Sequence, residues 1–230
     1  MKKTFWGGRR YCSLDYILKE RYSEKLYKLS LNGGMTCPNR DGKISEGGCI
    51  FCSAGGSGDF AANFNPDIAK QIEQAKTLVS KKYQGNRFIA YFQAYTNTYA
   101  PVEYLRKLFM DTIMRDDIAI LSIATRPDCL GDDVIELLAE LNRIKPVWVE
   151  LGLQTINEST ARLINRGYEL SCYDEAVRRL RNIGVEIITH MIIGLPYETK
   201  EDILSTAEYI GKTANGIKLQ LMYILKNTKL

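Results

Sequence analysis

The sequence predicts an α/β protein in which six parallel strands form an incomplete (β/α)₆ barrel. From about residue 86, short runs of β-branched and aromatic residues alternate with longer amphipathic segments, as in βαβ units. Gly184 follows a helical stretch, and Pro101, Pro127 and Pro196 each fall just past a predicted strand. Right-handed crossovers place all strand carboxyl ends on one face, where such barrels carry their chemistry. A flat doubly wound sheet has the same periodicity and remains the alternative.

The elements follow in chain order. Strands are predicted at Leu26–Leu31, Arg87–Gln93, Ile118–Ile123, Val147–Leu153, Glu186–Ile193 and Ile217–Tyr223. Helices are predicted at Pro66–Tyr83, Val102–Met114, Asp132–Asn142, Ser171–Ile183 and Lys200–Lys212, with a shorter helix at Glu158–Ile164. We expect residues 1–24 to form a basic, aromatic N-terminal extension and residues 25–230 to form one core. The sequence stops directly after the sixth strand, and we expect a longer natural protein.

Composition places the chain among ordinary globular proteins, with 45% hydrophobic and 25% charged residues. The longest apolar runs fall short of the roughly 20 residues that span a bilayer. The basic N-terminus lacks the apolar stretch of a secretory signal, so we expect a cytoplasmic protein without a membrane partner.

Residues 1–30 hold eight Lys or Arg and three Asp or Glu beside several aromatic residues. This segment is interpreted as a solvated arm or, alternatively, as a contact for nucleic acid.

Three cysteines carry the clearest chemical pattern. Eleven residues separate Cys37 from Cys49, two residues separate Cys49 from Cys52, and the glycine-rich stretch SAGGSGDF follows them. Asn39, Gly42 and their neighbours allow the intervening loop to fold back and bring Cys37 to the pair. We interpret Cys12, Cys129 and Cys172, which are scattered, as small buried residues.

Three thiolates favour an iron–sulfur cluster. A structural zinc site usually takes four Cys or His ligands, and the single histidine, His190, is far away in the sequence. Three thiolates on a [4Fe–4S] cluster leave one iron open to a small ligand such as S-adenosylmethionine (SAM). Zinc binding and incidental core cysteines remain alternatives.

The motifs CPNRDG, GGCIFC and GGSGDF resemble those of YhcC/YtqA-type radical SAM proteins and, more distantly, the radical SAM domain of the Elongator catalytic subunit. TRPDCL, ELGLQT, NRGY and HMIIGLP are similar to the same family at successive strand ends. The resemblance covers nearly the whole chain. It implies a partial radical SAM barrel and a further C-terminal portion beyond the sixth strand.

The resemblance also implies a SAM site. Its expected contacts are Phe51, Tyr95, Thr96, Asn97, Glu150, Gln154, Arg166, His190 and Gly194, and its cluster ligands are Cys37, Cys49 and Cys52. The sequence departs from the common pattern at Gln93–Tyr95, where related enzymes have a glycine pair, and at Ala124, where relatives often have Glu. From the residues alone, we expect Arg126 and Asp128 to pair. Glu150, on an apolar strand, needs a ligand or an ion pair such as one with Arg166.

The function that the resemblance implies is reductive cleavage of SAM to a 5′-deoxyadenosyl radical, which abstracts hydrogen from a substrate. A side chain on a wobble uridine of tRNA is the implied substrate, and flavodoxin or ferredoxin is an expected one-electron reductant. Two alternatives stay open. One is a zinc-stabilised nucleic-acid-binding module without catalysis, and the other is an iron–sulfur redox or sensor protein.

Overall fold

A computed structural model describes residues 5–56, 58–83, 85–226 and 228–230. Residues 1–4 of the predicted extension and residue 57 of the glycine-rich stretch lie outside the described residues. The strands are β1 (Tyr27–Leu31), β2 (Phe88–Phe92), β3 (Ile118–Thr125), β4 (Val147–Gln154), β5 (Glu186–Ile193) and β6 (Gly216–Leu221). The helices are α1 (Leu14–Tyr22), α2 (Ile68–Val79), α3 (Val102–Ile113), α4 (Asp132–Ile144), α5 (Glu158–Leu163), α6 (Leu170–Asn182) and α7 (Lys200–Thr213), with a 3₁₀ turn at Pro127–Cys129.

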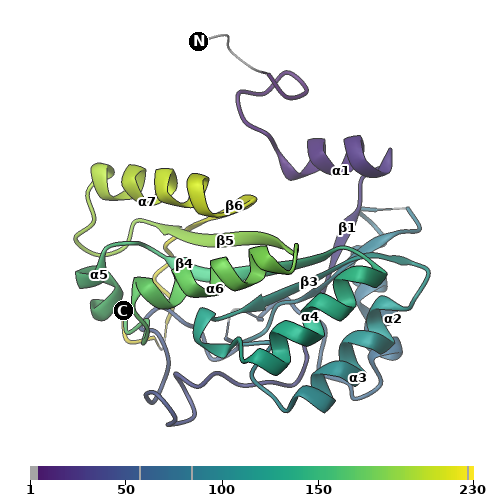
Figure 1. Ribbon diagram of the computed structural model, residues 1–230, viewed down its shortest axis with the longest axis horizontal. Coiled ribbons are helices and arrows are strands. Elements are labelled where there is room, and N and C mark those ends of the chain that lie inside the picture. The colour runs from purple at the N-terminus through teal and green to yellow at the C-terminus, as the bar shows by residue number, and fades with distance from the viewer. Residues whose placement is uncertain (1–4, 57, 84, 227) are drawn as a thin grey trace.

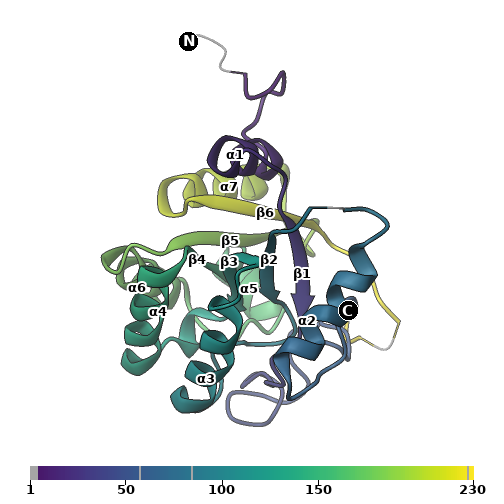
Figure 2. The same ribbon diagram turned by 90° about the vertical axis from the view of Figure 1, so that its right-hand side faces the viewer.

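All six strands are parallel and lie in the order β1-β2-β3-β4-β5-β6. The sheet curves into a half barrel with helices on its convex face (Figures 1 and 2). This confirms the predicted partial barrel over the flat doubly wound alternative, because a doubly wound sheet has helices on both faces and a reversal in strand order.

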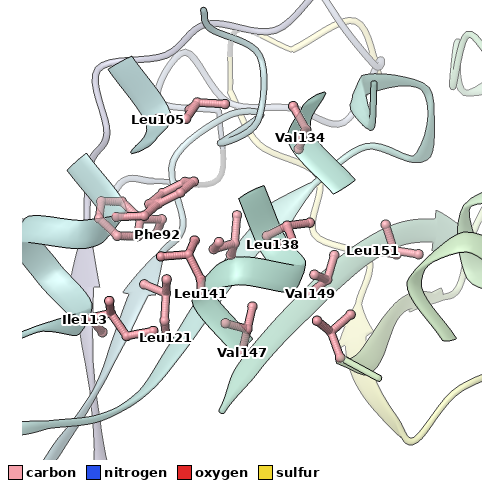
Figure 3. Packing of buried hydrophobic residues seen from close by; sticks show 14 of the residues in the cluster. Phe92, Leu105, Ile113, Leu121, Val134, Leu138, Leu141, Val147, Val149 and Leu151 are labelled. Atoms are coloured by element: carbon pink, nitrogen blue, oxygen red, sulfur yellow. The ribbon is translucent and has the colours of Figure 1, made fainter. Parts of the chain in front are cut away.

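The main core lies between the sheet and the outer helices. Leu121 and Val149 of the strands share this core with Leu105 of α3 and Leu138 of α4, and Leu138 lies close to Val149 (Figure 3). Side chains alternate between the two faces of a strand, so the outward positions are apolar and the inward positions are free for other roles. Local signals fix the helix starts: Asp67 caps α2, and Thr199 forms a capping box with Asp202 at α7.

Helix α1 closes the amino-terminal end of the half barrel and was not predicted. Its Leu18 is buried and packs with Leu26 against the inward-facing Ile89, Ile120 and Trp148. The helical part of residues 1–24 is therefore part of the packed structure and not a solvated arm. Among the described residues, none of the helices is long and apolar enough to cross a membrane.

Candidate functional site

A cavity of about 820 Å³ lies inside the half barrel and opens at the carboxyl ends of the strands. The loop between β1 and α2 covers this end (Figure 2). Side chains from β2 to β6 line the cavity, together with the three cysteines of that loop. The fold therefore brings the predicted cysteines and the predicted strand-end residues to one place.

Cys37, Cys49 and Cys52 are free thiols, each partly buried, and all three line the cavity. A hydrogen bond between the thiols of Cys49 and Cys52 raises the pKa of Cys49, as does burial, and lowers the pKa of Cys52. Nearby guanidinium groups of Arg40 and Arg126 favour the thiolate form of Cys52. The site thus offers three sulfur donors in a positively charged setting.

No three His, Cys, Asp or Glu side chains among the described residues are placed to hold a single metal ion. A four-iron cluster makes a different demand, because each of its three cysteine ligands binds a different iron. Three thiols around an open cavity have the donor chemistry for such a cluster, with room beside them for a further ligand. Cys12 is exposed, so its expected burial is wrong, and Cys129 and Cys172 are half-buried.

Two asparagines fix the loop that carries the cysteines. Buried Asn39 donates from Nδ2 to the carbonyl of Asn165 at 2.7 Å, and Asn165 donates from Nδ2 to the carbonyl of Gly48 at 2.9 Å. Ser45 donates to the side-chain oxygen of Asn39 at 2.9 Å. Gly167 permits this approach, since a Cβ there would lie 2.8 Å from the same oxygen. The long spacing between Cys37 and Cys49 is therefore an ordered loop.

The segment after β2 contacts the same cysteine-carrying loop. Tyr95 has a φ of 60° and donates from its hydroxyl to the carbonyl of Ala54 at 2.7 Å. Gly56 lies so close to the ring of Tyr95 that a Cβ on it would overlap the ring. Tyr95 and Thr96 line the cavity, whereas Asn97 does not. Asn97 is buried and donates to the carbonyls of Phe92 and Ala124, so it joins the ends of β2 and β3.

Gln154 and Arg166 also line the cavity. Gln154 ends β4 with a φ of 66°, a conformation that costs about 1 kcal/mol and is concentrated at functional sites. Arg166 is 1% exposed and donates to the carbonyls of Leu153 and Thr155. It pairs with Glu158 at 3.1 Å, so the expected pairing of Arg166 with Glu150 is wrong.

Arg126 pairs with Asp128 through two nitrogen–oxygen contacts of 2.9 and 2.7 Å, as expected. The guanidinium groups of Arg126 and Arg166 lie 5.0 and 4.7 Å from the ring centre of Tyr168. Tyr168 lines the cavity and donates to the carbonyl of Gly152. Sequence reasoning assigned Tyr168 no role, although it lies in the quoted NRGY motif.

Glu150 is fully buried on the inner face of β4 and contacts three basic groups. It forms ion pairs with Lys28 of β1 and Lys218 of β6, and Oε2 lies 2.7 Å from Nε2 of His190. Burial raises the pKa of Glu150, but the hydrogen bond to His190 and the charge of Lys28 outweigh burial and hold it well below the ordinary value. Burial lowers the pKa of His190, with Glu150 acting in the opposite direction.

The remaining two expected contacts lie at the β5 side. Phe51 lines the cavity and packs beside Ile164 and Ile192, where it supports the cysteine loop. Gly194 follows β5 with a φ of 91° and is not part of the cavity wall. The sequence reasoning missed Arg40, Lys28 and Lys218. The two lysines sit at inward positions of strands, and a charge at such a position was the available signal.

A sequence profile described as the Radical SAM superfamily matches residues 37–210. The chain is 48% identical to YtqA of Bacillus subtilis over 221 residues, which cover 96% of this chain and 69% of YtqA. It is 40% identical to YhcC of Escherichia coli over 213 residues, covering 92% and 68% of the two chains. A stretch of 112 residues is 29% identical to tRNA uridine(34) acetyltransferase of Dehalococcoides mccartyi, covering 47% and 24%. The fold matches archaeal Elp3 of Methanocaldococcus infernus with a TM-score of 0.64 and 17% identity, over 89% of this chain and 47% of that one.

Proposed function

This chain belongs to the radical SAM superfamily, and on that premise we propose that it modifies tRNA and holds its cluster on Cys37, Cys49 and Cys52. It is an enzyme, and its cofactors are a [4Fe–4S] cluster and SAM. The observation that supports the ligand assignment most directly is the position of three free thiols on one cavity at the carboxyl ends of the strands.

The bound cluster and SAM supply one-electron chemistry that allows removal of a hydrogen atom from an unreactive position. The chain's residues hold and orient these groups. Cys37, Cys49 and Cys52 would donate thiolates to the cluster. Arg40 and Arg126 supply positive charge that favours the thiolate of Cys52, and Arg126 also favours that of Cys49.

Phe51, Gln154 and Arg166 line the same cavity and form the proposed wall of the SAM site, together with Tyr95 and Thr96. The backbone fixes two of these side chains, because Tyr95 and Gln154 both adopt positive φ values. A small one-electron carrier such as flavodoxin or ferredoxin is the proposed class of reductant.

Anaerobic reconstitution tests the ligand assignment. Cys37→Ala, Cys49→Ala and Cys52→Ala should each lose cluster iron, whereas half-buried Cys172→Ala is the matched control and should retain it. SAM should change the electron paramagnetic resonance spectrum of the reduced wild-type protein, and SAM with dithionite should release 5′-deoxyadenosine. A zinc protein would stay colourless, and an electron carrier would bind no SAM. Equal iron loss in all four variants would contradict the assignment.

The mouth of the cavity has features suited to RNA. Phe60 is 89% exposed and Tyr223 is 68% exposed, and both line the cavity beside Arg40 and Lys226. Exposed aromatic rings stack on unpaired bases, and nearby cations contact the phosphates. The relative named tRNA uridine(34) acetyltransferase supports a wobble uridine as the modified base. The basic N-terminal segment supports it less, because α1 lies at the opposite end of the barrel from the cysteine loop (Figure 2).

Binding of tRNA tests this part of the proposal. Phe60→Ala should weaken tRNA binding about tenfold, since loss of one stacked base costs roughly 1–3 kcal/mol. Phe5→Ala removes a 55% exposed ring from the N-terminal segment and should leave binding unchanged. If Phe5→Ala weakened tRNA binding more than Phe60→Ala, the tRNA contact would lie on the N-terminal segment and not at the cavity mouth. Comparison of the modified nucleosides of a deletion strain with those of its parent identifies the base.

A further inference from the structure

Each of the six strands contributes one polar side chain to a single cluster inside the half barrel, which we call the charged layer. Its members are Lys28, Tyr91, Ser122, Glu150, His190 and Lys218. Below it lies the apolar floor, formed by Ile89, Ile120 and Trp148, which precede Tyr91, Ser122 and Glu150 by two residues on their strands. The layer is therefore the closed end of the cavity.

The charges of this layer do not balance. Glu150 is its single carboxylate, and the ammonium groups of Lys28 and Lys218 both pair with it. His190 adds no compensating negative charge, and its lowered pKa keeps the ring neutral near pH 7. One positive charge is left over beside the buried Glu150, on lysine side chains that are only 26% and 32% exposed, where an uncompensated charge is less well hydrated than at the surface.

Lys218 has the means to contact a ligand. Its ammonium donates to the hydroxyl of Tyr91 at 2.9 Å and lies 3.4 Å from Glu150, so the contact with the carboxylate is long. An ammonium has three N–H groups, and the Lys218 side chain is 32% exposed toward a cavity that it lines. Burial lowers the pKa of Lys218. The charge of Glu150 raises this pKa, and the nearby charge of Lys28 lowers it.

Small residues keep the layer open to the cavity. The register partner of Glu150 on β3 is Ala124, and the partner of His190 on β4 is Gly152. Both small residues line the cavity, as do Glu150, His190 and Lys218. Ala124 presents only a methyl group beside Glu150, and a Cβ at Gly152 would lie 2.9 Å from the side-chain nitrogen of Gln154, so glycine leaves room for that amide at this part of the wall.

We propose that the charged layer binds an acidic group of the substrate, a carboxylate or a phosphate, with Lys218 as the residue that contacts it. The proposal rests on the proposed function, because it places the substrate in the cavity that also holds the cluster and SAM. A negative group here neutralises the excess positive charge and anchors the substrate at the closed end. The part of the substrate that reacts then extends toward the cysteine loop.

The single histidine of the chain reports on this site. We would record the ring signal of His190 by nuclear magnetic resonance in the holoprotein with an oxidised cluster, while adding phosphate or acetate at constant ionic strength set with chloride. Binding should give a saturable change in the signal and raise the pKa of His190 by about 1, because a nearby negative charge favours the protonated ring. The two anions distinguish a phosphate site from a carboxylate site.

Three variants complete the test. Lys218→Met should abolish the saturable change, and Lys218→Arg should keep it because the positive charge remains. Lys107→Met, which alters a 79% exposed lysine on α3, is the matched control and should behave as wild type. The proposal is overturned if neither anion acts beyond chloride, or if Lys218→Met responds like wild type. Release of 5′-deoxyadenosine without substrate is measured in parallel, so failure of this site is distinguished from failure of the radical SAM assignment.

Discussion

Replacement of Glu150 by glutamine should destabilise the protein more than the loss of an exposed carboxylate does. Glutamine keeps the size of the side chain but removes the charge that pairs with Lys28 and Lys218. Removal of one partner from a buried ion pair costs about 3–5 kcal/mol. The two lysine side chains are 26% and 32% exposed and can turn partly toward water, so we expect the lower end, about 3 kcal/mol.

Thermal unfolding of the holoprotein under anaerobic conditions measures this loss. For a chain of this size, 1 kcal/mol lowers Tm by about 2–4 °C, so Glu150→Gln should lower it by about 6–12 °C. Glu140→Gln breaks a pair with Arg106 in which the Glu140 side chain is 40% exposed, and it should cost below about 1 kcal/mol. Equal shifts in Tm for the two variants would refute the argument from burial.

The same variant has a predictable pH dependence. The pKa of Glu150 is depressed in the folded protein, so its contribution to stability is present above the ordinary value of 4.5 and is lost as the pH falls through the lower folded value. The gap in stability between wild type and Glu150→Gln should therefore be constant near neutral pH and narrow at acid pH. The pKa of His190 should fall further in the variant, because Glu150 raises it. An unchanged pKa would show that the two side chains are not coupled.

Three further substitutions test the supports of the site. Asn39→Ala removes a buried hydrogen-bonded amide and should lower stability by about 2 kcal/mol and reduce iron retention, whereas exposed Asn63→Ala should do neither. Gly56→Ala should lower Tm by more than a surface substitution does, and Tyr95→Ala in the same chain should recover part of the loss if overlap with the ring is the cause. Leu18→Ala should cost about 2–4 kcal/mol in urea unfolding; a loss below about 0.5 kcal/mol would mean that α1 does not pack on the barrel.

The fold could be predicted largely because its strands are buried on the outer face and separated by amphipathic helices. Val147 and Ile118 begin strands where the alternation predicts them, and Val102 and Lys200 begin helices as predicted. Helix α1 was missed because it is short, its apolar residues do not gather on one marked face, and only Leu18 is buried within it. Its contacts come from strands far along the chain, and no local pattern encodes them.

The site residues could be predicted where they belong to a motif with a characteristic spacing along the sequence. The three cysteines, Gln154 and Arg166 come together on one cavity as the motifs indicate. Partners separated by long stretches of chain were not predictable, and Lys28 with Glu150 is the clearest case, at a sequence separation of 122 residues. Asn97 shows that a motif can also mislead. Its place in the motif after β2 indicates a ligand contact, but its amide joins the ends of two strands.

The closure of the barrel by α1 has a consequence for synthesis. Leu18 is translated early, yet Ile89, Ile120 and Trp148, against which it packs, follow much later. The apolar side of this helix therefore has no native partner while most of the barrel is still being made on the ribosome. Docking of α1 must come late, and a nascent chain stalled before Trp148 should be a target for chaperones that bind exposed apolar helices.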